Sequence, residues 1–138
     1  MVVVDDTLLL AVLAGSAPRA ALVGDVSTTG SWYWRLTRAV LDDRSTGSLT
    51  RAFLRLPEED QQRVREGLRS LPNEIGLLSF RRLVPIMAAL EGVRRLNLLT
   101  AEAVAAALVL DADIAVTTRS PLLDGACERL GIQVHLIA

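Results

Sequence analysis

The chain of 138 residues contains no lysine and a single cysteine, Cys127. One cysteine excludes an internal disulfide and a metal site built from several thiolates, so we expect Cys127 to be a small core residue on a helix. All 15 basic residues are arginine and 16 residues are acidic, which gives a net charge of −1. With so little net charge, binding to nucleic acid or to an anionic membrane would depend on a local patch.

Long apolar runs are also missing, since none reaches the roughly 18 to 20 residues that cross a bilayer. The apolar N-terminal segment is interrupted by Asp5 and Asp6 and follows no basic residue, unlike a signal peptide. We therefore expect a cytoplasmic protein without membrane attachment. Hydrophobic residues still make up 51% of the chain and the mean hydropathy is +0.36. These values favour a well-covered sheet or an apolar surface for a partner, such as a second copy in a homodimer.

Short apolar runs alternate with segments of helical periodicity along the whole chain. The expected strands are residues 2–4, 20–25, 74–79, 113–118 and 132–137. The expected helices are residues 5–15, 31–43, 49–56, 57–71, 80–96, 99–110 and 120–131. Such alternation predicts a three-layer α/β/α domain spanning residues 1–138, with a mainly parallel sheet covered by helices on both faces. A functional site would lie at the carboxyl ends of the strands.

Several residues are expected to begin helices. Asp6 is the predicted cap of the first helix, and Asp5 is either a cap or a site residue. Thr100 is expected to cap the alanine-rich helix, and Ser120 to cap the last helix with Pro121 at its first position.

Polar residues follow two of the expected strands. Asp5 ends the first strand, Thr117 and Arg119 lie at the end of a later one, and Glu102 stands near the start of the alanine-rich helix. This arrangement resembles the PIN domain, the fold of VapC-type toxin ribonucleases. The resemblance covers "VVVDDTLLLAVLAG" (2–15), "SWYWRLTRAVLDDRSTGSLT" (31–50) and "LTAEAVAAALVLDADIAVTTRSPLLDGACERLGIQV" (99–134), in the order expected for the family.

In active PIN domains, acidic side chains at four motif positions bind Mg²⁺ or Mn²⁺ and cleave RNA with an activated water. Hard divalent cations prefer oxygen ligands, and they neutralise charge that develops on the phosphate. The resemblance implies that Asp5 matches the first acid and Glu102 the third. Arg35 and Arg119 fall on the second and fourth positions.

The two arginines lead to the main hypothesis. A guanidinium is permanently charged and matches carboxylate oxygens, so Arg35 and Arg119 would supply the positive charge that a metal supplies elsewhere. Each replacement also removes a ligand and adds repulsion against a cation. We therefore expect a PIN-like protein with a degenerate site, no bound metal and no cleavage, acting by binding to a protein partner, to itself or to RNA.

Two alternatives remain open from the sequence. One is an active Mg²⁺- or Mn²⁺-dependent endoribonuclease of a toxin–antitoxin pair, with the metal held by Asp5, Glu102 and Asp124 and with an antitoxin as partner. The other is an unrelated α/β interaction domain. Each site residue also has a simpler interpretation, because Glu102 would be favourable in the first turn of any helix and Arg35, Arg119 and Asp124 would suit a solvent-exposed surface.

The remaining conspicuous residues are aromatic or titratable. One or both of Trp32 and Trp34 are expected in the core or an interface, although an exposed pair would stack on RNA bases. His135, in the last expected strand, has no acid partner that its spacing identifies, so we interpret it as a half-buried strand residue.

Overall fold

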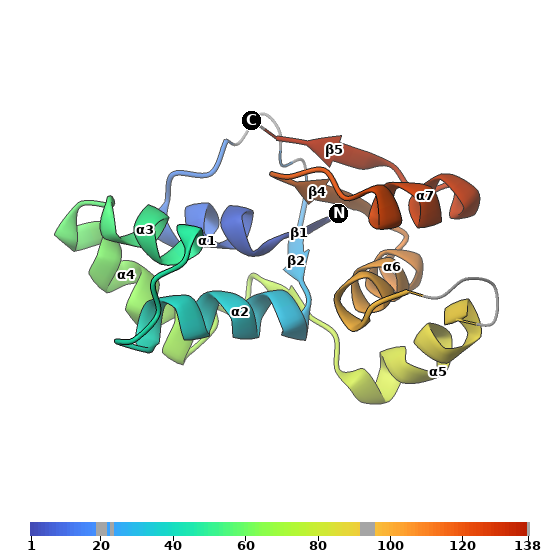
Figure 1. The fold of residues 1–138 in the computed structure, drawn as a ribbon, viewed down its shortest axis with the longest axis horizontal. Coiled ribbons are helices and arrows are strands. Elements are labelled where there is room, and N and C mark those ends of the chain that lie inside the picture. Colours follow the sequence, from blue (N-terminus) through green and yellow to red (C-terminus); the bar gives the residue numbers. More distant parts are fainter. Residues whose placement is uncertain (19–21, 23, 92–95, 138) are drawn as a thin grey trace.

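The computed structural model describes residues 1–18, 22, 24–91 and 96–137. Its strands are β1 (Val2–Val4), β2 (Val26–Thr28), β3 (Gly76–Leu77), β4 (Asp113–Val116) and β5 (Val134–Leu136). Within these ranges they form one sheet in the order β3-β2-β1-β4-β5, and every strand pair is parallel (Figure 1). The predicted three-layer α/β/α class is confirmed.

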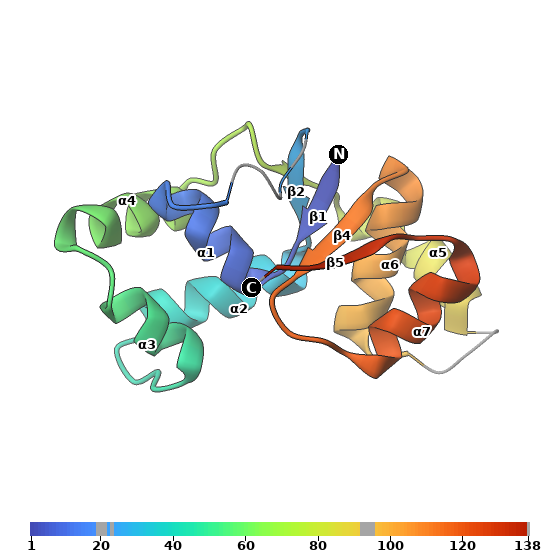
Figure 2. The same ribbon diagram turned by 90° about the horizontal axis from the view of Figure 1, so that it is seen from above.

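Helices cover both faces of the sheet. One group consists of α1 (Asp6–Ala14), α2 (Gly30–Leu41), α3 (Ser48–Leu54) and α4 (Glu58–Arg69), and the other of α5 (Phe80–Glu91), α6 (Leu98–Leu110) and α7 (Pro121–Leu130). Figure 2 shows the two groups on opposite sides of the strands. Side chains alternate along β1, so Val2 and Val4 pack in the core with α1 while Val3 packs in the core with α6.

The alanine-rich helix α6 lies in the core. Its thirteen residues are mostly apolar, and Ala103, Ala105 and Ala106 are at most 1% exposed. Small side chains let this helix approach the sheet and its neighbours α5 and α7 closely. None of the helices in the described ranges combines the length and the apolar composition needed to cross a bilayer.

The second strand differs from the prediction. It was expected at 20–25, where residues 20, 21 and 23 lie outside the described part of the chain, and it is found at Val26–Thr28, in a segment that looked like a turn. The buried hydroxyl of Thr28 is tolerated there because it has a partner, the Val4 carbonyl, to which it donates at 2.9 Å. The polar residues of β2 therefore gave no sign of a strand, although β2 lies next to the central strand β1.

The third strand is shorter and more exposed than predicted. Only Gly76–Leu77 pairs with β2, and Leu77 is 43% exposed because β3 lies at an edge of the sheet. Gly76 lies beside Ser27, so closely that any side chain at this position would collide with the serine hydroxyl. Glycine at position 76 therefore allows β3 to pair with β2, although glycine has a low propensity for strands.

Helix caps were predicted in part. Ser120 caps α7 and Pro121 follows it, as expected, and Gly15 ends α1 with a φ of 79°. Two caps were wrong by one to three positions: Asp5 rather than Asp6 caps α1, and Asn97 rather than Thr100 caps α6. Each true cap accepts from a backbone N–H three residues later, which the sequence could not distinguish.

Cys127 lies on α7 and is 1% exposed, which confirms it as a core residue on a helix. Burial, and then the nearby charge of Asp124, raise the pKa of its thiol to about 11. The thiol therefore stays protonated at neutral pH and is a weak nucleophile.

Candidate functional site

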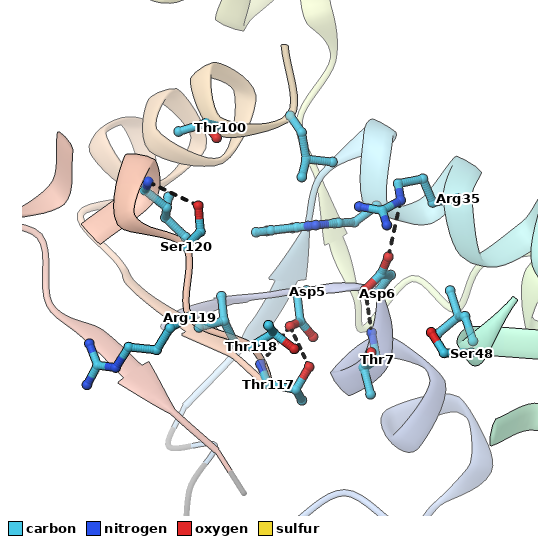
Figure 3. A pocket seen from close by; sticks show the side chains of 15 residues that line it. Asp5, Asp6, Thr7, Arg35, Ser48, Thr100, Thr117, Thr118, Arg119 and Ser120 are labelled. Carbon is cyan, nitrogen blue, oxygen red and sulfur yellow. Dashed lines mark hydrogen bonds and ion pairs between the residues drawn. The ribbon is translucent and has the colours of Figure 1, made fainter. Parts of the chain in front are cut away.

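A cavity of about 340 Å³ lies at the carboxyl ends of β1 and β4 (Figure 3). The chain leaves β1 toward β2 on one side, and β4 adds on the other side, so this is the point where the strand order reverses and where α/β sheets bind ligands. Asp5, Arg35 and Arg119 all line the cavity, as the sequence predicted. Glu102 is not among the residues that line it.

Asp5 is held by three hydrogen bonds. Its Oδ1 accepts from the Leu8 N–H at 2.9 Å, which caps α1. Its Oδ2 accepts from the Thr117 N–H at 2.7 Å and from the Thr117 hydroxyl at 3.0 Å. The residue is 6% exposed. One carboxylate therefore fixes the start of α1 and joins the carboxyl ends of β1 and β4, so both interpretations of Asp5, as cap and as cavity residue, apply together.

Arg35 pairs with Asp6, not with Asp5. The distance from Arg35 Nε to Asp6 Oδ2 is 3.5 Å, and Asp6 Oδ1 accepts from the Thr7 N–H at 2.9 Å. Desolvation by burial raises the pKa of Asp6, the Arg35 guanidinium lowers it, and the carboxylate of Asp5 raises it further, with a net upward shift. This pairing corrects the hypothesis that arginine neutralises the first motif acid, because the neighbouring aspartate receives the cation.

We expect Asp6→Asn to leave the free energy of unfolding at pH 7 unchanged or higher. A raised folded-state pKa means that the ionised carboxylate is less stable in the folded than in the unfolded chain, so removing the charge removes a cost. The lost contact with Arg35, whose side chain is 52% exposed, is worth only about 0 to 1 kcal/mol.

The pH dependence of this variant follows from the same shift. The cost of ionised Asp6 is fully present above its raised pKa and disappears below the unfolded-state value of about 4. Denaturant unfolding of wild type and variant across this interval should show the advantage of Asp6→Asn shrinking as the pH falls. An advantage that grows toward low pH would contradict the assignment.

Arg119 points away from Asp5 (Figure 3). Its Nη1 lies 3.3 Å from Oδ2 of Asp124, and the two side chains are 66% and 30% exposed. The predicted contact between Arg119 and the first motif acid is therefore replaced by a surface pair on the start of α7. Thr117, two residues earlier, provides the partner of Asp5 instead, and its place directly after an apolar strand was a usable signal.

Glu102 performs a different task from the one predicted. It is 1% exposed, its Oε2 accepts from the Gly30 N–H at 3.0 Å, and its Oε1 accepts from the Ser31 N–H at 2.9 Å. An anion at the N-terminus of α2 satisfies backbone donors that have no partner within the helix. The residues of α6 that line the cavity are Leu99 and Thr100.

The acidic residues do not fit a divalent cation. In the part of the chain that the structure describes, no group of three or more Asp, Glu, His or Cys side chains is arranged to hold a metal ion. Both oxygens of Asp5, Asp6 and Glu102 already contact donors, and a guanidinium stands beside Asp6. Mg²⁺ and Mn²⁺ need several free oxygen ligands, which this donor set does not offer.

His135 has an acid partner that the sequence did not identify. Its Nε2 lies 2.8 Å from Oδ2 of Asp113 across β4 and β5, and the two side chains are 47% and 49% exposed. Neither residue lines the cavity. The pair belongs to the sheet edge.

No protein-family model matches the chain, and no curated protein matches it. The likeness to PIN domains rests on the motifs of the sequence and on a fold class that many unrelated functions share.

Proposed function

We propose that this chain is a PIN-like domain, similar to VapC-type toxins, whose acidic site has become a set of structural contacts and which acts by binding rather than by cleaving RNA. The observation that carries the proposal is that both carboxylate oxygens of Asp5 already accept hydrogen bonds. All three of its hydrogen bonds come from the protein itself, from the Leu8 N–H and from two groups of Thr117.

The charges of the cavity support a binding role. Asp5 and Asp6 are the acids that line it, and Arg35 and Arg119 are the cations. Hydrolysis of a phosphodiester at neutral pH needs an activated water, which a metal or a free general base provides. Asp5 accepts three hydrogen bonds and Asp6 is paired with Arg35, so neither offers a metal the pair of open carboxylates that such a site needs.

The resemblance suggests three classes of ligand for such a domain: an antitoxin-like protein, a second copy of the chain in a homodimer, or RNA. The two arginines are at least half exposed and accessible to an anionic ligand. Their guanidinium groups would bind carboxylate or phosphate oxygens without any metal.

A cleavage assay tests the proposal. Single-stranded and structured RNA are incubated with wild type and with Asp5→Asn in the presence of Mg²⁺ or Mn²⁺, beside a known metal-dependent ribonuclease as positive control. We expect no RNA cleavage above the buffer background with either protein. Metal-dependent cleavage that is lost in Asp5→Asn would contradict the proposal and support the alternative, an active endoribonuclease toxin.

A further inference from the structure

A second hollow adjoins the cavity. It is a groove of about 700 Å³ lined by α2, by the segment between α2 and α3, and by the start of α3. Arg35, Ser48 and Leu49 line both the groove and the cavity, so the two are continuous. The predicted site residues do not account for the groove, because only Arg35 belongs to it.

The groove contains an exposed indole. Trp34 is 59% exposed, whereas Trp32, the other tryptophan of the chain, is 4% exposed and packs in the core. The prediction of a core tryptophan is therefore confirmed for Trp32, whereas Trp34 lies outside the core. The guanidinium carbon of Arg38 lies 5.3 Å from the centre of the Trp34 ring, and this cation–π contact orients the ring.

Three arginines, Arg35, Arg38 and Arg44, line the groove. Two of them have acid partners, because Arg35 pairs with Asp6 and Arg44 lies 3.7 Å from Asp42. Arg38 forms no ion pair with any acid in the described part of the chain, and its charge faces the Trp34 ring. The groove thus combines an exposed aromatic face with one arginine charge that has no acid partner among the described residues and two that lie at exposed ion pairs.

From this combination we infer that the groove binds single-stranded nucleic acid, with one base stacked on Trp34 and backbone phosphates on Arg38 and Arg44. The inference rests on the proposed function, since it names the ligand class of a domain that binds without cleaving. Stacking platforms flanked by arginine are the means by which proteins hold unpaired bases without reading sequence. An acidic peptide would satisfy the arginines and leave the indole without a planar partner.

The test measures binding of labelled oligo(U) and oligo(dT), each about 10 nucleotides long, by fluorescence anisotropy in EDTA. Trp34→Ala should weaken binding about 5- to 100-fold, and Arg38→Ala should reduce the slope of log K against log salt by about 0.7. Phe80→Ala and Arg81→Ala are matched controls, because both residues are exposed on α5, across the sheet from α2. Neither control should change affinity.

Intrinsic fluorescence adds a direct readout of stacking. In a Trp32→Phe protein the remaining indole is Trp34, and its emission should be quenched by either oligonucleotide. Equal binding of RNA and DNA indicates recognition of base and phosphate, and a preference for RNA indicates a further contact with the 2′-hydroxyl. Both results support the inference.

Three results would overturn it: no binding of either oligonucleotide at low salt, binding that Trp34→Ala and Arg38→Ala leave intact, or Trp34-dependent binding of an oligoglutamate peptide alone. These failures are distinct from failure of the proposed function. Metal-dependent RNA cleavage would contradict the noncatalytic role even if the groove bound nucleic acid as expected. Absence of both cleavage and oligonucleotide binding would contradict only the groove.

Discussion

Glu102→Ala is expected to lower the free energy of unfolding by about 2 to 4 kcal/mol, more than any of the other substitutions proposed for this chain. The substitution removes the acceptors of the Gly30 and Ser31 N–H groups, which lie in a largely buried site at the start of α2. Each unsatisfied donor costs about 1 to 3 kcal/mol, and the lost side chain leaves a cavity in the core. For a domain of this size the melting temperature should fall by roughly 10 °C.

Two further variants separate the specific role of Glu102 from a general effect of the change. Glu128→Ala makes the same substitution on α7, where the side chain is exposed, and should change stability by less than about 0.5 kcal/mol. Glu102→Gln should lie between wild type and Glu102→Ala, because the amide keeps one acceptor and turns a donor toward the other N–H group. If Glu102→Ala left stability unchanged, the structural role of Glu102 at the start of α2 would be contradicted, and its carboxylate would be a candidate metal ligand once more.

Asp5→Asn is expected to lower the free energy of unfolding by about 1 to 3 kcal/mol. Both carboxylate oxygens of Asp5 accept hydrogen bonds, whereas the amide of asparagine has only one acceptor oxygen. If its oxygen keeps the Leu8 N–H, its NH₂ group faces the Thr117 N–H, and the reverse orientation breaks the cap of α1. Urea unfolding at neutral pH measures the change, with coincident fluorescence and circular dichroism transitions as the check on two-state behaviour.

The sign of this effect distinguishes the two interpretations of Asp5. In a cluster of metal-binding carboxylates without its metal, neutralising one acid relieves repulsion and stabilises the fold. In this chain the same substitution should destabilise the fold. Thr117→Val removes only the hydroxyl donor to Asp5 and should cost about 1 kcal/mol. Near-additive effects of Asp5→Asn and Thr117→Val in a double-mutant cycle would show that the two residues do not interact.

Periodicity was sufficient for the layers of the fold. The β-branched run Val2–Val4 and the capped segment Pro121–Leu130 have local patterns that agree with their final structure. The second strand was misplaced because Ser27 and Thr28 are polar. The burial of Thr28 depends on its hydrogen bond to the Val4 carbonyl, and a partner far away in the chain leaves no periodic signal.

The candidate site was predicted at the level of its location and not of its contacts. The parallel sheet follows from the alternation of elements. The carboxyl ends of β1 and β4 meet because these two strands are also neighbours, which the structure shows and alternation does not determine. The pairing of Arg35 with Asp6 instead of Asp5 depends on where α1 begins, because Asp5 is the extended N-cap and Asp6 the first helical residue, and their side chains point in different directions. Glu102 did leave a signal, since an acid inside an alanine-rich apolar helix indicates an internal hydrogen-bond partner.

The most direct test of the account is a titration of Mn²⁺ into the wild-type chain, followed by isothermal calorimetry. It asks whether hydrogen bonds and ion pairs within the protein already engage the carboxylates beside β1 and β4. We predict no saturable uptake tighter than about 1 mM, the weak end of protein sites for divalent cations. Uptake of one or more ions at micromolar concentration, abolished by Asp5→Asn, would contradict the assignment of Asp5 as a structural carboxylate.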